Sequence, residues 1–172
     1  MTTVIHGATS RTSDCRVRFG AFEPSQLPAF LAMLSRCSGS TLFRRFHGFT
    51  DGTAHARRLA ASGAHRTVVA WCGQRCVGVA SLAQGPAGHD LGVVVEDDWQ
   101  RQGIGTALVG RLLAWARAEG VGEFGADVLS GDEFALRALR RAGAVAATLE
   151  RGVYRVTVSL GPGPLPAARA RR

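Results

Sequence analysis

The stretch VVVEDDWQRQGIGTAL, Val93 to Leu108, joins an apolar strand to a helix through a turn that contains Gly103 and Gly105. A tight strand-to-helix turn presents successive backbone N–H groups outward, and the helix N-terminus adds the positive end of its dipole. Glycine lets an anion approach such a backbone closely. The stretch therefore predicts a phosphate-binding turn.

Two familiar nucleotide-binding motifs do not fit this turn. A Rossmann fingerprint needs a small residue three positions after Gly105, where this chain has Leu108. A Walker loop needs Gly-Lys-Ser/Thr, and the chain contains no lysine. A glycine-rich turn without any ligand is the remaining structural alternative.

The sequence on both sides of the turn predicts a mixed α/β domain without internal repeats. Upstream, DLGVVVE is apolar on both faces, as in a central strand. Downstream, TALVGRLLAWARAEG carries an apolar helical stripe and ends at Gly120. Further strands are predicted at residues 15–22, 66–72, 76–82, 124–129, 144–150 and 153–160, and further helices at 23–37, 40–46, 53–63 and 132–143. The strand pairs 66–72 with 76–82 and 144–150 with 153–160 are predicted hairpins.

Composition indicates a single domain. The chain has 172 residues, of which 46% are hydrophobic and 20% charged, enough for one core. We expect the domain over residues 15–160, with 1–14 as a flexible N-terminus and 161–172 as a flexible Pro/Gly/Ala/Arg tail. The sequence contains neither an apolar signal-peptide core nor a membrane span, so we expect a cytoplasmic protein that does not contact membranes.

The charge and the cysteines argue against several classes of function. The net charge is +8, and all 21 basic residues are arginines. They are scattered in pairs without aromatic residues between them, which argues against nucleic acid but suits an anionic cofactor. The four cysteines are too few and too irregularly spaced for a disulfide scaffold, and Cys72 and Cys76 are expected to pack at the ends of the first hairpin. No metal site is predicted, because neither the cysteines nor the histidines have ligand spacing.

The segment Gln100-Arg101-Gln102-Gly103-Ile104-Gly105, with its preceding strand and following helix, resembles the acetyl-CoA-binding motif of the GNAT family of N-acetyltransferases. The order of elements over about residues 15–160 is similar to that family as well. The resemblance implies a GNAT-type acyl-CoA N-acyltransferase fold, with a central mixed, mostly antiparallel sheet flanked by helices. STLFRRFHGF, residues 40–49, also resembles a segment of the bacterial protein-acetyltransferase-like branch.

The resemblance assigns acetyl-CoA to three places. The amides from Arg101 to Thr106 would hold the pyrophosphate, the strand backbone at Val93 to Val95 would bind the pantetheine arm and polarise the thioester carbonyl, and Asp132 aligns with an Asn that often begins the later helix. The residues assigned in this way are Val93, Val94, Val95, Gln100, Arg101, Gln102, Gly103, Ile104, Gly105, Thr106 and Asp132.

One residue departs from the family pattern. Where the family often has a Tyr that donates a proton to the departing thiolate, this chain has Leu139, and its only tyrosine is Tyr154 in the closing hairpin. A thiol with a pKa of about 8.5 is a tolerable leaving group that water can protonate.

An amine acceptor must lose a proton before it attacks, so a carboxylate near the acetyl group is needed. Asp90, at the start of the strand DLGVVVE, lies close to where protein-acetylating members carry a Glu and is the first candidate for this base. Glu96 is the second, although the acids Glu96, Asp97 and Asp98 beside an anion site are expected to form an outward-facing turn. Trp99 is expected to pack, and His89 is a candidate substrate contact beside Asp90.

These observations predict an enzyme that moves an acetyl group from acetyl-CoA to a primary amine by direct attack in a ternary complex. Protein lysines and small-molecule amines both remain open as acceptors, and so do a monomer and a homodimer. The alternative, which follows from Leu139, is a catalytically weak acyl-CoA-binding or regulatory domain. A basic nucleic-acid-binding module is the third class, and it would show steeply salt-dependent affinity.

Overall fold

A computed structural model describes residues 15–61, 65–85 and 88–161 of the chain. They form one seven-stranded sheet with the order β1-β2-β3-β4-β5-β7-β6. The strands are β1 (Val17–Ala21), β2 (His65–Cys72), β3 (Arg75–Gly85), β4 (Gly88–Val95), β5 (Glu123–Leu129), β6 (Ala144–Glu150) and β7 (Val153–Ser159). Every neighbouring pair is antiparallel except β4 and β5, which are parallel. The mixed, mostly antiparallel sheet and both predicted hairpins are confirmed.

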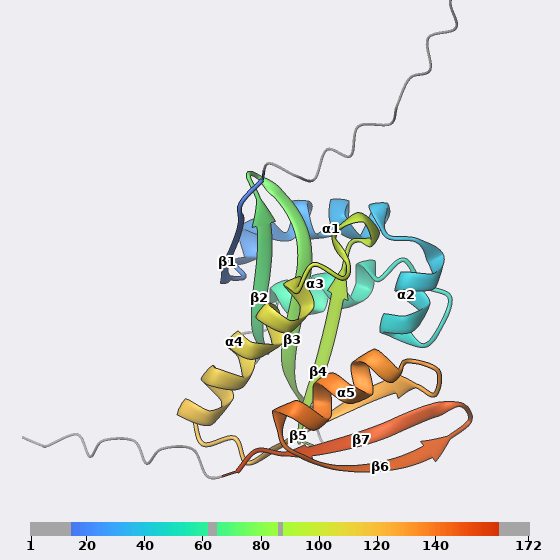
Figure 1. The fold of residues 1–172 in the computed structure, drawn as a ribbon. Coiled ribbons are helices and arrows are strands. Elements are labelled where there is room, and N and C mark those ends of the chain that lie inside the picture. Colours follow the sequence, from blue (N-terminus) through green and yellow to red (C-terminus); the bar gives the residue numbers. More distant parts are fainter. Residues whose placement is uncertain (1–14, 62–64, 86–87, 162–172) are drawn as a thin grey trace, which may run out of the picture.

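Helices lie on the two faces of the sheet. They are α1 (Leu27–Arg36), α2 (Gly39–Phe46), α3 (Thr53–Ala61), α4 (Ile104–Ala118) and α5 (Glu133–Ala142), with single 3-10 turns at Pro24–Gln26 and Asp97–Trp99. Figure 1 shows α4 in front of β2 and β3, α1 and α3 on the other side of these strands, and α5 lying along the β6–β7 hairpin. The predicted helices are thus confirmed to within a few residues, although Gly63, expected to end α3, lies outside the described residues.

The sheet separates two apolar clusters. On one face, Leu108, Leu112 and Phe124 are among the residues that pack α4 and α5 against the strands. On the other face, Phe30 and Met33 of α1 pack with α3 against β2, β3 and β4. The central strands therefore have apolar residues on both sides, which explains why DLGVVVE lacks a polar face. Trp99 is buried in the first cluster, as expected.

Cys72 packs at the end of the first hairpin, as expected, but it also makes a contact that the sequence did not predict. Cys72 forms a disulfide with Cys15, with 5.8 Å between their Cα atoms. The pairing of β1 with β2 places Val17 opposite Cys72, so the chain just before β1 is brought to the end of β2. The two cysteines are 57 residues apart, and their spacing alone contains no sign of this contact. Cys76 is a buried free thiol, as a packing role requires.

The ends of the chain remain a prediction. Residues 1–14 and 162–172, expected as flexible segments, lie outside the described residues. No helix in the described ranges is long and apolar enough to cross a membrane.

Candidate functional site

The strands β4 and β5 pair at one position only. Their single registered pair is Asp90 with Gly125, although β4 continues to Val95 and β5 to Leu129. We call the position of this pair the fork. Beyond it, β4 is hydrogen-bonded to β3 alone, and β5 to β7 alone. Figure 1 shows β4 and the β6–β7 hairpin running in clearly different directions from this point. The β4 edge at Val93, Val94 and Val95 therefore faces the gap between the two halves of the sheet, where an extended ligand can bind to backbone groups that β5 leaves unpaired, although the Val95 carbonyl already accepts from Gln100.

The turn after β4 has the geometry that an anion site needs. Arg101 has a φ of 59° and Gly103 a φ of 80°, and Gly103 is the N-cap of α4. Among the backbone hydrogen bonds that lie outside helices and strands in the described residues, none uses an N–H group between Arg101 and Thr106. The first turn of a helix has no intrahelical partners for its own N–H groups. Donors and the positive helix end thus coincide at Gly103, Ile104, Gly105 and Thr106.

Gln100 has a different role in this turn. Its Nε2 atom donates to the Val95 carbonyl at 2.9 Å and to Thr41 Oγ1 at 3.0 Å. The side chain therefore joins the end of β4 to α2. Gln102 Nε2 likewise donates within the turn, to the Asp98 carbonyl at 2.8 Å. These two amides hold the turn in shape, and the free N–H groups of the backbone are left for a ligand.

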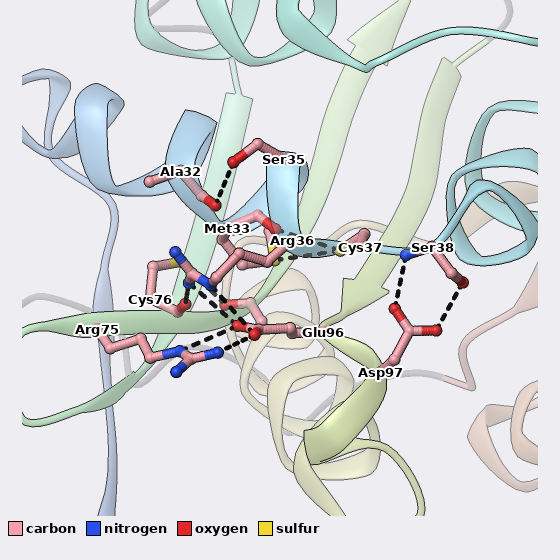
Figure 2. A network of polar contacts seen from close by, with 11 residues as sticks. Ala32, Met33, Ser35, Arg36, Cys37, Ser38, Arg75, Cys76, Glu96 and Asp97 are labelled. Carbon is pink, nitrogen blue, oxygen red and sulfur yellow. Dashed lines mark hydrogen bonds and ion pairs between the residues drawn. The ribbon is translucent and has the colours of Figure 1, made fainter.

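Glu96 does not face outward, and this part of the prediction is wrong. Only 2% of the residue is exposed. It accepts hydrogen bonds from Arg36, at 3.0 and 3.1 Å, and from Arg75 (Figure 2). Burial opposes ionisation, but the hydrogen bonds and charges of both arginines outweigh it and hold the pKa of Glu96 below its usual range. The two arginines are distant in sequence, so the acid run alone gave no sign of them.

Asp97 is also hydrogen-bonded to other parts of the protein, whereas Asp98 is exposed as expected. Asp97 accepts hydrogen bonds from the Ser38 amide at 2.8 Å, the Ser38 hydroxyl at 2.6 Å and the Thr41 hydroxyl at 2.9 Å. Burial opposes ionisation, but these donors keep the pKa of Asp97 low. Figure 2 shows the bonds from Ser38, at the start of α2, reaching Asp97 beside the Glu96 cluster. Two of the three acids therefore fasten the turn to α1 and α2, away from the anion site.

The thiols next to this cluster are not nucleophiles. Burial raises the pKa of Cys37 to about 12, and the nearby Asp97 and Glu96 act in the same direction. Burial likewise raises the pKa of Cys76 to about 12. Both stay protonated at neutral pH, and a thiol without its thiolate is a poor nucleophile.

Asp90 lies at the fork itself. Within the described residues its side chain takes part in no hydrogen bond or ion pair. A Cβ atom added to Gly125 would lie 3.4 Å from Asp90 Oδ1, so the carboxylate leans over β5. Burial raises the pKa of Asp90, and the like charge of Asp127 adds to the effect, while Arg45, Arg155 and His47 oppose it. A carboxylate with a raised pKa and no bonded partner is free to accept a proton.

Alternation along β4 separates the residues around Asp90. Gly92 and Val94 share the Asp90 face, and Val94 packs in the cluster with α1. His89 lies one position away on the strand and therefore on the opposite face, toward α4. Its predicted role beside Asp90 would need a substrate on that other face.

The helix α5 has an N-cap at Asp132 but no proton-donating side chain at position 139. Asp132 is the N-cap, and its Oδ1 accepts from the Ala135 amide at 3.0 Å. Leu139 is buried in the core with 6% exposed, and Tyr154 packs against the same cluster from β7. An open cavity of about 360 Å³ lies between α2 and the loop after β5, lined by Arg44, Leu129, Ser130, Gly131, Asp132 and Gly152. No cluster of three or more metal-ligating side chains occurs in the described part of the chain.

Known proteins share this fold. The model of the acetyltransferase (GNAT) family matches residues 38–144. The GNAT domain of S. lividans PAT superposes with a TM-score of 0.74 at 19% identity, covering 84% of this chain and 90% of that domain. The structure of yncA from Salmonella typhimurium with its cofactor acetyl-CoA superposes with a TM-score of 0.65 at 16% identity, covering 88% of this chain and 98% of that one. The paia N-acetyltransferase from Thermoplasma acidophilum in complex with coenzyme A superposes with a TM-score of 0.66 at 8% identity, covering 84% of this chain and 99% of that one. At such identities the superpositions show the fold alone, and no curated protein sequence matches significantly.

Proposed function

Since the chain belongs to the GNAT family of acetyltransferases, we propose that it transfers an acetyl group from acetyl-CoA to a primary amine by direct attack in a ternary complex. The acceptor is the amine of a small molecule or of a protein lysine. The structural neighbours described with acetyl-CoA or coenzyme A support this choice of donor.

The observation that carries the proposal is the unpaired edge of β4 beside a turn of free N–H groups. The edge begins after Asp90, and the turn lies at the other end of the same strand. In our proposal the backbone at Val93 to Val95 binds the pantetheine arm, and the amides from Arg101 to Thr106 bind the pyrophosphate. Both contacts come from the backbone, so they depend on the fold more than on side-chain identity.

Asp90 is the proposed general base. Acetyl-CoA supplies the activated thioester, and the acceptor amine must lose a proton to attack it. Asp90 lies at the start of the open edge, has no bonded partner and has a raised pKa. Its short side chain reaches the amine directly or through one water. Glu96 is the weaker candidate, because accepting a proton would break its contacts with Arg36 and Arg75.

Leu139 favours one alternative, a domain that binds acyl-CoA and turns it over weakly. This residue is buried at the position where the family often has its acidic tyrosine. In our proposal the departing thiolate is protonated from solvent instead, since a thiol with a pKa of about 8.5 needs little assistance.

Two measurements test the proposal. Isothermal titration calorimetry with acetyl-CoA should show saturable binding, and a thiol-release assay with a panel of amines should show release that depends on the amine. Absence of acetyl-CoA binding would rule out both the enzyme and the alternative. Binding without thiol release for any amine would favour the alternative over the enzyme.

A further inference from the structure

Gly92 is an unusual residue for the middle of β4. It lies between Leu91 and Val93 in an apolar strand, where glycine packs poorly and weakens the strand. Arg45 of α2 occupies the space that a side chain would take there. A Cβ atom added to Gly92 would lie 1.9 Å from Arg45 Nη2 and 2.2 Å from its Cζ. The guanidinium thus lies directly on the strand, and a side chain at position 92 would displace it.

Arg45 is a partly buried cation. Burial lowers its pKa, and the charge of Asp90 acts in the opposite direction. Its Cζ lies 5.0 Å from the centre of the Phe46 ring, and its Nη2 is 3.1 Å from His55 Nε2. Within the described residues, no carboxylate lies within ion-pair distance of it. Partly buried charges are usually paired, so a guanidinium whose one close polar partner among the described residues is an imidazole marks a position where an anion can bind.

The guanidinium of Arg45 lies close to the position proposed for the acceptor amine. Gly92 is two residues from Asp90 on the same face of β4, roughly 7 Å along the strand. Arg45 therefore lies on the side of the sheet where Asp90 leans over the fork. The proposed pyrophosphate site is farther away, in the turn after the other end of β4. An anion at Arg45 would thus belong to the molecule whose amine meets Asp90.

We propose that Arg45 binds a carboxylate of the acceptor, and that the acceptor is a small amine carrying this acid group close to its amine. This inference rests on the proposed acetyl transfer. Asp90 receives the ammonium end, and the planar fork of Arg45 receives the carboxylate, which matches it in shape and charge. Arg45 is then the specificity-determining residue. It would repel a second ammonium, so polyamines are poor acceptors.

Binding and turnover of matched acceptors test this inference. Glycine, methionine, β-alanine and γ-aminobutyrate are each compared with their own carboxamides, which keep the amine and lose the negative charge. Calorimetry on the protein saturated with coenzyme A gives affinity, and thiol release gives kcat/KM over a range of pH. At least one acid should bind and react at least tenfold better than its amide.

The variant Arg45→Met should abolish this preference. It should lower kcat/KM for the preferred acid at least tenfold and change that for the amide less than about threefold. Arg45→Gln, which keeps a donor for His55, should give the same pattern if the methionine variant folds poorly. Arg58→Met, which replaces an exposed arginine of α3, is the control and should keep the wild-type preference.

Three results would overturn the inference. In the first, no acid binds or reacts better than its amide. In the second, no acid binds measurably at all. In the third, Arg45→Met lowers turnover of acids and amides by the same factor, which would show that Arg45 assists acetyl transfer itself. Failure of the proposed function is distinct from all three, because it appears as absent acetyl-CoA binding before any acceptor is added.

Discussion

The two ends of β4 each carry a carboxylate, and the two carboxylates have opposite surroundings. Asp90, at the fork, has no bonded partner, and its pKa is raised. Glu96, just after the strand, lies between Arg36 and Arg75, and its pKa is lowered. A carboxylate held by two guanidiniums would lose both contacts on protonation, whereas one without partners loses none. The fork is therefore suited to chemistry, and the Glu96 end to holding the structure.

The largest effect that we predict is on turnover in Asp90→Asn. Asparagine keeps the size and polarity of the side chain but accepts no proton, so kcat should fall by roughly 10² to 10⁴ while affinity for acetyl-CoA stays nearly unchanged. Raising the pH should recover part of the loss, because more of the amine is then deprotonated in solution. Steady-state kinetics across pH, with calorimetry for acetyl-CoA, measure both quantities.

The stability of Asp90→Asn serves as a control, because it shows whether a loss of turnover comes from unfolding. Because the folded protein raises the pKa of Asp90 above its ordinary value of 3.8, the ionised carboxylate does not stabilise the fold at neutral pH. Asp90→Asn should therefore unfold at the same denaturant concentration as wild type or a higher one. Equal and modest losses of kcat in Asp90→Asn and Glu96→Gln would instead favour deprotonation by bulk solvent.

Much of this comparison could be predicted from the sequence, and the remainder could not. Strands and helices follow from local periodicity, and the turn at Gly103 and Gly105 follows from its own residues. The place of Asp90 at the start of β4 is local as well. The partners of Glu96 are not, because Arg36 is 60 residues away and Arg75 is 21 residues away. Three consecutive acids resemble a solvated turn until the fold brings these arginines to them.

The contact between Gly92 and Arg45 could not be predicted from the sequence for the same reason. In DLGVVVE this glycine resembles an ordinary interruption of an apolar run, and only the fold shows that Arg45 of α2, from a distant part of the chain, lies on it. The disulfide between Cys15 and Cys72 likewise depends on the pairing of β1 with β2. In each case the local pattern gives the element, and contacts between elements give the role.

The second prediction concerns the stability of Glu96→Gln. The neutral amide leaves Arg36 and Arg75 facing each other without an anion, so the free energy of unfolding should fall by roughly 2 kcal/mol. The loss is smaller than for a fully buried pair because the arginine side chains are 32% and 45% exposed. Urea denaturation measures it, and Asp98→Asn, at the exposed neighbour, should change stability by less than about 0.5 kcal/mol.

Acid should reveal the same difference. Because the pKa of Glu96 is lowered from its ordinary 4.5 in the folded state, its contribution is present above that value and is lost as the pH falls through the folded pKa. Wild type should therefore lose stability below about pH 4.5 more steeply than Glu96→Gln. If the two proteins have parallel pH profiles, Glu96 does not hold its arginines as an anion.

The third prediction concerns the turn after the Glu96 end. Gly105→Val should weaken acetyl-CoA binding about tenfold, or ~1.4 kcal/mol, by blocking the approach of phosphate to the backbone. Gly105 is a cleaner test than Gly103, because the φ of 80° at Gly103 would strain any other residue. A Cβ at Gly105 would meet only Val95, at 3.8 Å. Gly110→Val, at an exposed glycine of the same helix, is the matched control, and equal affinities in the two variants would contradict the phosphate assignment.

The smallest effect that we predict is in Gln100→Ala, which asks whether the Glu96 end binds ligand through side chains or only holds its backbone in place. Gln100 Nε2 already donates to Val95 and Thr41, so its loss should reduce acetyl-CoA affinity only two- to threefold, or ~0.5 kcal/mol, through a looser turn. Thr41→Val removes the hydroxyl that this amide meets and should give a similar small loss. If Gln100→Ala weakens binding more than Gly105→Val does while Thr41→Val has no effect, the Gln100 side chain itself binds acetyl-CoA, and the division between a chemical end and a structural end of β4 is too simple.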